Sequence, residues 1–412
     1  MMKEEEFAPF NFPIVDMSEK IIKVIGVGGG GGNAVHHMWE AGVRNVTFMV
    51  VNTDSQVLKA NMVPNKVQLG DGLGTGGNPE LGREIAEASK DKIKSMFDAD
   101  TKMVFITAGM GGGTGTGVAP VIARMAKELG ILTVGVVTLP FLMEGKKRID
   151  KALKGMEELK KHVDSLIVIN NERLLEEDQY SGLDLEEGMK KADEVLTIAT
   201  KTIAEIITVR GIVNRDFNDV SAVMKESGAA VVSVAKASGE RRIFKAMESA
   251  LNSPLIANVD KQKIKRLLYI VYGGTKSPAK MSELLEINKF MEGLDENIEV
   301  LWGHYQDETL EDEIKVSIIA TGFDMDDEEE EKVQTDESEH NRKLRDKYYH
   351  FEKEEKETLK EVEQPLPASD ENIATEEVKV EDEEDEPEEE IEEPKPSLIR
   401  IFMEKLKNFA EE

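Results

Sequence analysis

A run of nine residues, 109–117, holds six glycines between two apolar segments. The segment before it, residues 103–108, is typical of a buried strand, and the segment after it, residues 118–126, is typical of a helix. A strand followed by bare backbone and a helix N-terminus presents successive N–H donors to an anion. Glycine suits such a loop because it adopts positive φ and because a Cβ would keep a phosphate away. The run therefore predicts a phosphate-binding loop.

A second glycine cluster follows the strand-like segment 20–27. Read alone, Gly26-x-Gly28-x-x-Gly31 matches the dinucleotide fingerprint, and Asp54 follows about 20 residues later. A domain that binds a nicotinamide cofactor is therefore one interpretation, and the longer glycine run, which such a domain does not need, argues against it. Neither cluster contains a lysine, so a P-loop of the G-x-x-x-x-G-K-[ST] type is excluded. Phosphates would instead be held by backbone amides, hydroxyls and a metal ion.

The composition excludes several classes of protein. The 412 residues include no cysteine, which excludes disulfides, a cysteine nucleophile and a thiolate metal site. Residues 1–12 lack an apolar core of signal-peptide length, and no window approaches the roughly 18 apolar residues that span a membrane. We therefore expect a cytoplasmic protein without direct membrane insertion.

The net charge of −30 lies mostly in the C-terminal part of the chain. Residues 324–412 hold 35 acidic and 13 basic side chains, whereas the preceding body is only mildly acidic. We expect no binding to nucleic acid through general electrostatics. Dense charge with few aromatics predicts a disordered linker over residues 324–394, within which residues 342–360 are compatible with a transient charged helix. Apolar residues at helical spacing from Leu398 to Phe409 then favour a docking peptide over a frayed terminus.

Strand-like and helix-like patterns alternate from residue 20 to about residue 209, which predicts a Rossmann-like α/β domain with a parallel sheet. The strands are expected at residues 20–27, 46–51, 67–69, 103–108, 131–139 and 165–169. Apolar residues spaced three and four apart predict one long helix over residues 184–209. A second, smaller α/β domain is expected beyond it, with helices and strands alternating at residues 217–225, 229–237, 241–252, 266–273, 282–291, 298–302 and 314–320.

Four motifs resemble those of one known family, in the same order. Residues 111–117 read GGGTGTG, the signature of the tubulin and FtsZ superfamily of GTPases. The four stretches are IKVIGVGGGGGNAV at 22–35, MVFITAGMGGGTGTG at 103–117, FLMEGKKR at 141–148 and RGIVNRDFNDV at 210–220. Over residues 21–322 the chain resembles the FtsZ family of bacterial cell-division proteins, and Thr116, where tubulins usually carry serine, favours that branch.

The resemblance implies an organisation in six parts. These are a disordered N-terminal segment (1–19), a GTP-binding domain (20–183), a core helix (184–209), a C-terminal domain that activates GTP hydrolysis (210–323), the acidic linker (324–394) and a partner-binding peptide (395–412).

The resemblance also implies a site for GTP or GDP in which both glycine clusters hold the phosphates. The residues concerned are Gly29, Gly30, Gly31, Gly32, Asn33, Gly112, Gly113, Thr114, Gly115, Thr116 and Gly117. Thr75, Gly76 and Gly77 resemble the loop that senses the γ-phosphate, although the lead-in from Gly70 is shorter than in the family and glycines replace its usual alanines. Asp54 lies near the phosphates and metal in the family, or simply caps the next helix.

The resemblance places the rest of the nucleotide on side chains from other segments. Glu144 would accept hydrogen bonds from the ribose hydroxyls, and Arg148 would lie over the nucleotide. Asp193 would accept from the N–H groups that distinguish guanine from adenine, as a carboxylate can. Met189 stands where the family often has a stacking phenylalanine.

Catalysis is implied to be shared between subunits. Asn214, Asp216 and Asp219 follow the long helix, which at about 1.5 Å per residue sets them tens of ångströms from the glycine clusters. In the family, such carboxylates polarise the attacking water on the nucleotide of the next subunit, Asn214 would contact that nucleotide, and Mg²⁺ would neutralise phosphate charge. Asp216 and Asp219 are also compatible with a helix cap and a first-turn acid.

The implied partners are a second copy of the chain and a membrane tether. Head-to-tail contacts that do not close generate filaments, and FtsZ proteins bind tethering partners such as FtsA through their C-terminal peptide. We therefore expect the chain at the mid-cell division ring. Two alternatives are a nicotinamide-dependent dehydrogenase and another tubulin-like filament protein.

Overall fold

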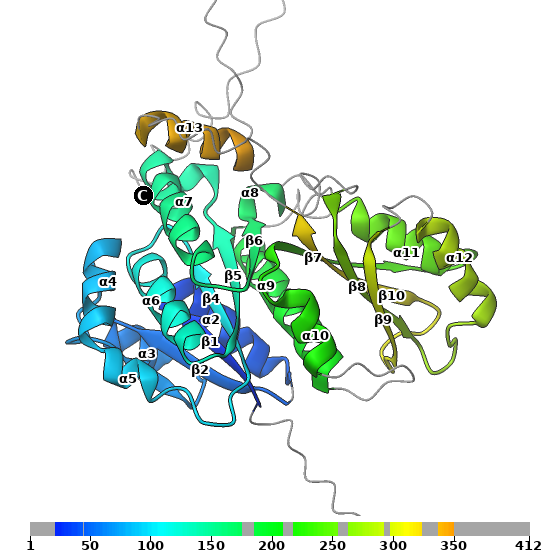
Figure 1. Cartoon of the computed structure of the whole chain (residues 1–412), viewed down its shortest axis with the longest axis horizontal. Helices are drawn as coiled ribbons and strands as arrows, with labels where there is room; N and C mark the ends of the chain where they lie inside the picture. The colour runs from blue at the N-terminus through cyan, green and yellow to red at the C-terminus, as the bar shows by residue number, and fades with distance from the viewer. Residues whose placement is uncertain are drawn as a thin grey trace, which may run out of the picture. The chain divides into compact units, whose positions relative to one another are not determined.

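The computed structural model describes residues 21–43, 45–174, 185–208, 217–253, 263–291, 297–323 and 337–349. These residues belong to one compact unit, which extends to Glu352. A ten-stranded sheet with the order β3-β2-β1-β4-β5-β6-β7-β10-β8-β9 forms its centre, and helices cover both faces (Figure 1).

The first seven strands of this order are parallel to one another. They are β3 (Lys66–Gln68), β2 (Thr47–Asn52), β1 (Ile22–Val27), β4 (Met103–Gly109), β5 (Leu132–Leu139), β6 (Ser165–Asn170) and β7 (Gly228–Ala237). Every strand expected over residues 20–209 is present, with ends shifted by at most two residues. Buried parallel strands are apolar on both faces, which is why their sequences are easy to recognise.

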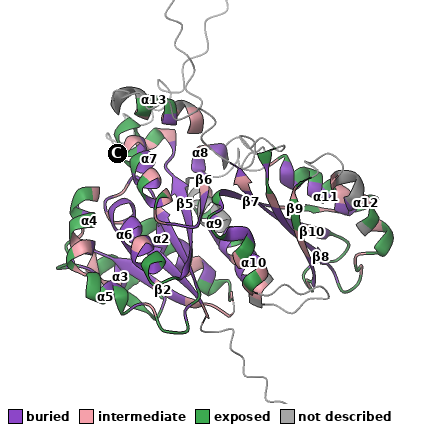
Figure 2. Ribbon diagram, viewed as in Figure 1, coloured by how far each residue is buried: buried purple, intermediate pink, exposed green. Residues whose placement is uncertain are grey.

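Alternate residues of each strand enter different core clusters, as the period of two requires. In β1, Ile22 and Val24 pack on one face, whereas Ile25 and Val27 pack on the other. One face is covered by α2 (Gly28–Glu40), α3 (Ser55–Ala60), α9 (Leu185–Thr208) and α10 (Phe217–Met224). The other is covered by α4 (Pro79–Ala88), α5 (Lys90–Lys94), α6 (Thr114–Glu128), α7 (Lys146–Lys160), α11 (Arg242–Leu251) and α12 (Met281–Met291). Figure 2 shows the buried sheet beneath helices whose outer sides are exposed.

The C-terminal strands extend the same sheet. β10 (Ile314–Phe323) lies antiparallel between β7 and β8 (Arg266–Gly273), and β9 (Glu299–Gln306) forms the edge. The sequence predicted a second, smaller α/β domain for this region, and the structure has its elements in the expected order. A feature that the sequence did not predict is that β6 pairs with β7 at three positions, 165–167 with 228–230, so one sheet runs through both halves.

A helix, α13 (Glu337–Tyr348), lies where the sequence predicted a disordered charged linker with no more than a transient helix over residues 342–360. It contacts α7, and Tyr349 just beyond it is only 2% exposed. The structure therefore differs from that expectation for residues 337–349, because Leu344 and Tyr349 supply apolar contacts that the surrounding charge conceals in the sequence.

Several sequence predictions lie outside the described residues. They are the N-terminal segment 1–19, the loop residues Asn214 and Asp216, the linker from residue 350 to residue 394 and the peptide 395–412. Among the helices that the structure describes, none has the length and apolar character needed to cross a membrane.

Candidate functional site

A cleft of about 310 Å³ lies where β1, β4, β5 and β6 end. Ligands of open α/β sheets bind at this edge, and the volume suits a molecule of nucleotide size. The cleft is lined by Gly29, Gly30, Asn33, Thr75, Gly109, Met110, Gly112, Gly113, Thr114, Gly115, Thr138, Pro140, Glu144, Arg148 and Asn171.

The N-termini of two helices meet at the floor of this cleft. A Cβ built on Gly28, at the start of α2, would lie 2.8 Å from the backbone nitrogen of Gly115 in the first turn of α6. The first N–H groups of a helix have no partner within it, and the helix dipole favours negative charge at this end. Two such ends side by side make a site for the phosphates of a ligand.

Both helices begin earlier than the sequence predicted. Residues 29–32 lie in the first turns of α2, and residues 114–117 form the first turn of α6, although both stretches were predicted to be loops. The glycines let the helix ends reach their neighbours closely, because a Cβ on Gly31 would lie 2.2 Å from the carbonyl oxygen of Thr107. Positive φ, the other reason for expecting glycine, applies in the run 109–117 only to Gly111.

Two glycines of the cleft have space in front of them instead. A Cβ on Gly29 or Gly112 would meet no atom of the described part of the chain within 4 Å. Because both residues line the cleft, this space is open to a ligand. By contrast, a Cβ on Gly113 would lie 2.1 Å from Oγ1 of Thr75. Neighbouring glycines of one motif thus serve contact with a ligand and contact with the protein itself.

The loop that contains Thr75 is fixed from both sides. The N–H of Gly74 donates to the carbonyl oxygen of Thr53 at 2.9 Å, and Nζ of Lys151 on α7 donates to the carbonyl oxygen of Gly77 at 2.7 Å. Thr75 lines the cleft and is 7% exposed, whereas Gly76 and Gly77 are not among the described lining residues.

The loop after β2 brings two hydroxyls together. Oγ1 of Thr53 lies 2.7 Å from Oγ1 of Thr114, at the start of α6. Asp54 accepts from the N–H groups of Gln56 and Val57, so the simpler interpretation of Asp54 as a cap of α3 is confirmed.

The wall of the cleft after β5 carries the expected carboxylate of Glu144 and the expected guanidinium of Arg148. Glu144 ends the short 3₁₀ helix η1 (Leu142–Glu144), and Arg148 lies in the first turn of α7. Oε1 of Glu144 accepts from the N–H of Phe141 at 2.9 Å, and Oε2 lies 3.0 Å from Nε of Arg148. The carboxylate therefore has a fixed orientation and keeps lone pairs available for a ligand.

The sequence analysis did not assign Asn171, Thr138 or Pro140 to the site. Asn171 begins α8 (Asn171–Leu174) directly after β6, and its buried Oδ1 has no hydrogen-bond partner among the residues that the structure describes. A buried unpaired acceptor is costly, and a donor on a ligand would satisfy it. Each of the three lies near the carboxyl end of a parallel strand or directly after it, and that position was the signal available in the sequence.

Other predicted site residues lie away from the cleft or outside the described side chains. The side chains of Met189 and Asp193, both on α9, are not described, and neither are Asn214 and Asp216. Asp219 lies in the first turn of α10. Since β6 and β7 are parallel, the chain between them must return to the edge where β7 begins, opposite the cleft.

Comparison with known proteins gives the family. Residues 21–179 match the Tubulin/FtsZ family, GTPase domain, and residues 228–324 match the FtsZ family, C-terminal domain. Cell division protein FtsZ of Porphyromonas gingivalis is 47% identical to this chain over 328 residues, which are 78% of this chain and 71% of that protein. The chain belongs to the FtsZ family.

Further FtsZ proteins agree along most of their length. Cell division protein FtsZ of Wigglesworthia glossinidia brevipalpis is 42% identical over 82% of this chain and 88% of that protein. An FtsZ dimer from M. jannaschii has a similar structure, with a TM-score of 0.68 and 41% identity over 74% of this chain and 88% of its own. As an FtsZ-family protein with a GTPase domain, the chain binds GTP or GDP and hydrolyses GTP. A nicotinamide-dependent dehydrogenase is not favoured.

Proposed function

We propose that this GTPase is a self-assembling cytoskeletal protein of the bacterial division ring, which binds GTP in the cleft and forms head-to-tail filaments at mid-cell. The two relatives described above are cell division proteins, which supports a role in division, and the similar FtsZ dimer supports self-association. The observation that carries the nucleotide site is the meeting of two glycine-rich helix N-termini in one cleft.

In the proposed complex the phosphates lie on the first turns of α2 and α6. Gly29 and Gly112 leave space for close approach, and the hydroxyl of Thr114 adds a donor. Thr75 faces the γ-phosphate side. Mg²⁺, if bound, would neutralise charge on the β- and γ-phosphates. At nucleotide sites this ion is usually held largely by the phosphates themselves.

The sugar and base occupy the wall formed by the ends of β5 and β6. Glu144 accepts from the ribose hydroxyls and Arg148 lies over the nucleotide. Asp193 accepts from the guanine N–H groups, with Met189 against the ring, and the unpaired Oδ1 of Asn171 adds a further acceptor on this side.

The cleft itself supports assembly. Leu73 and Met143 are 84% and 68% exposed, and they lie two residues before Thr75 and directly before Glu144. Large exposed apolar side chains beside a ligand site are typical of a surface that another protein covers. We assign that role to a second copy of the chain, whose Asn214, Asp216 and Asp219 complete the site.

The position of these carboxylates in the chain supports catalysis on the nucleotide of a neighbouring subunit. α9 has 24 residues, so at about 1.5 Å per residue it is about 36 Å long. Asp219 lies beyond its far end, at the edge opposite the cleft. Asp216 and Asp219 therefore act on a neighbour's nucleotide, where they orient and polarise the attacking water.

Replacing Asp216 tests this assignment. The variant Asp216→Ala should bind GTP as the wild type does and lose at least about 100-fold in turnover, the lower range for a lost catalytic base. Asp100→Ala, which removes an exposed carboxylate before β4, is the matched control and should keep wild-type turnover. Calorimetry gives the affinity and phosphate release gives the rate. Near-normal turnover by Asp216→Ala would contradict the shared site.

The C-terminal part completes the proposal. Because residues 337–349 belong to the folded unit, the proposed flexible linker is residues 350–394, and about 45 residues of such a chain would have a root-mean-square reach of roughly 34–40 Å. The peptide 395–412, amphipathic and locally basic, would dock an FtsA-like membrane tether at the end of that linker. The filament is thereby held at the membrane by a partner.

A further inference from the structure

Residues 337–349, which we call the strap, lie at the end of the described chain and pack on the first half of the sheet. α13 lies beside α7 (Figure 1). Leu344 and Tyr349 are 9% and 2% exposed, and both join the core cluster on this face. The strap is therefore part of the folded unit.

Charged contacts fix the position of the strap along α7. Nη1 of Arg345 lies 2.9 Å from Oδ1 of Asp150, and the Arg345 side chain is only 13% exposed. Five residues earlier in α13, Nε2 of His340 lies 2.9 Å from Oε1 of Glu157. Because these pairs are spaced along both helices, they define one register.

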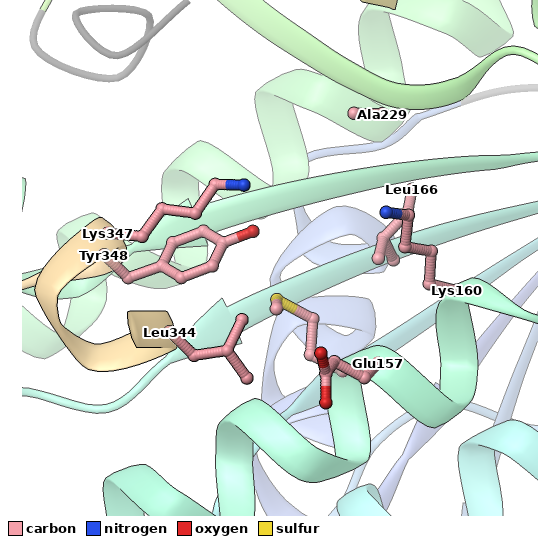
Figure 3. Close-up of a pocket in the computed structure, with 8 residues that line it drawn as sticks. Glu157, Lys160, Leu166, Ala229, Leu344, Lys347 and Tyr348 are labelled. Atoms are coloured by element: carbon pink, nitrogen blue, oxygen red, sulfur yellow. The ribbon is translucent and has the colours of Figure 1, made fainter. Parts of the chain in front are cut away.

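The strap also reaches the junction between the two halves of the sheet. In Figure 3 the side chains of Leu344, Lys347 and Tyr348 extend from α13 toward Leu166 of β6, with Ala229 of β7 nearby. A small hollow remains between them, lined by Met156, Glu157, Lys160, Leu166, Ala229, Leu344, Lys347 and Tyr348.

The last residue of the strap bonds to the wall of the nucleotide cleft. The buried hydroxyl of Tyr349 donates to the carbonyl oxygen of Pro140 at 2.7 Å. Pro140 lines the cleft, and the next residue, Phe141, holds Glu144 through its N–H. Burial raises the pKa of Tyr349, and the carboxylates of Glu144 and Glu172 raise it further, so the hydroxyl remains a donor.

A second chain of hydrogen bonds, besides the one from Tyr349 to Pro140, connects Tyr348 to the end of β6. The side-chain amide of Asn170 donates to the carbonyl oxygen of Tyr348. Oδ1 of Asn170 accepts from the N–H of Glu172 at 3.0 Å, and Oε2 of Glu172 accepts from the N–H of Leu142 at 2.8 Å. Asn171, which lines the cleft, lies between Asn170 and Glu172 in the chain.

We propose that the strap positions the sugar and base side of the nucleotide cleft, with Tyr349 as its main positioning residue. Its two chains of hydrogen bonds hold the segments that directly follow β5 and β6, and these segments carry Glu144 and Asn171. This inference rests on the proposed function in one respect, the assignment of Glu144 to the ribose hydroxyls. It adds that a segment after the last strand sets the affinity of the cleft.

The test removes one hydroxyl from the full-length protein. Calorimetry measures the dissociation constants of GDP and 2′-deoxy-GDP for the wild type, for Tyr349→Phe and for the control Tyr269→Phe, which changes another buried tyrosine on β8. Tyr349→Phe should weaken GDP binding by about threefold to tenfold, the usual effect of one lost hydrogen bond. It should weaken 2′-deoxy-GDP less, so the preference for GDP falls. Tyr269→Phe should match the wild type.

The outcomes separate the inference from the proposed function. Unchanged GDP binding by Tyr349→Phe, or equal weakening of both nucleotides, would overturn the positioning role while leaving the proposed function intact. A wild-type protein that binds neither GDP nor GTP would overturn both.

A charge exchange provides a second test that keeps Tyr349. Arg345→Asp places two carboxylates together against α7 and should weaken GDP binding in the same selective way. Adding Asp150→Arg restores the pair with its charges reversed and should recover most of the affinity. Failure of the double variant to recover, with an unchanged melting temperature of the nucleotide-free protein, would overturn the inference.

Discussion

At the scale of single residues, the glycines of the two clusters have two different roles: some leave space for a ligand, and others allow close contact between protein segments. The sequence predicted their place and their phosphate-binding role as a group, because a strand, bare backbone and a helix recur in that order. It could not predict which glycines contact protein, since this depends on segments far away in the chain. Gly113 needs to be small because of Thr75, and Gly117 because of Pro79, whose carbonyl oxygen would lie 2.0 Å from an added Cβ.

The adjacent pair Gly112 and Gly113 turns this difference into a prediction. Gly113→Ala should destabilise the protein by about 1–3 kcal/mol, as overpacking does, because its Cβ meets Thr75 and the backbone of Asn78. Gly112→Ala should leave the free energy of unfolding nearly unchanged and weaken GTP binding, because its Cβ enters open space in the cleft. Urea unfolding and calorimetry on both variants measure the two effects. Equal stability losses would contradict the division of roles.

At the scale of elements, the sequence predicted each of the described strands and the long helix α9, because continuous apolar runs and spacings of three and four are local signals. For the charged segment it predicted only a transient helix over residues 342–360, and it missed that α13 begins at Glu337 and packs on α7. It also missed that β6 and β7 pair, since only three residue positions of each strand meet. Asn171 was missed for a related reason: its role depends on a buried position that the sequence does not mark.

One contact between α11 and α12 predicts that the stability of the folded protein depends on pH. Arg242 of α11, 4% exposed, bonds to both carboxylate oxygens of Glu283 on α12 and to the carbonyl oxygens of Pro278 and Asp312. The hydrogen bond from Arg242 is the largest cause that lowers the pKa of Glu283 below 4.5. A carboxyl group whose folded-state pKa is lowered contributes stability above its unfolded pKa and loses it as the pH falls through the folded value.

Glu283→Gln should therefore cost about 3 kcal/mol of unfolding free energy at pH 7, the lower range for breaking a buried pair. The difference from wild type should shrink below pH 4.5, where Glu283 itself becomes protonated. The control is Glu311→Gln, since Glu311 and Lys276 are 82% and 78% exposed and such pairs contribute about 0–1 kcal/mol. Urea unfolding across this pH range provides the measurement. A difference that stays constant with pH would assign the cost to packing.

At the scale of the whole molecule, the nucleotide cleft lies where the parallel strands end, and the chain runs along α9 to the opposite side, where β7 begins. In the proposed function, a subunit built this way holds GTP at one end and its catalytic loop at the opposite end, so stacking in a single direction would bring the two together. The contact does not close on itself, because the two surfaces differ, and repeated stacking gives a filament. Assembly and hydrolysis are then one event in this proposal.

Two inactive variants should restore each other if the site is shared. Asp216→Ala keeps its cleft and lacks the carboxylate that serves a neighbour, whereas Gly112→Ala keeps the carboxylate and binds GTP weakly. Mixed at a GTP concentration that saturates only the first variant, they should regain a turnover that neither shows alone, because a Gly112→Ala subunit supplies Asp216 to the GTP of an Asp216→Ala neighbour. With random stacking, about a quarter of the contacts have this productive order, so the recovered rate should approach a quarter of wild type. Phosphate release from the mixture and from each variant at the same total protein concentration measures this. If the mixture is no more active than its components while light scattering shows that both assemble together, each molecule must cleave its own nucleotide, and the carboxylates at the far edge have another role.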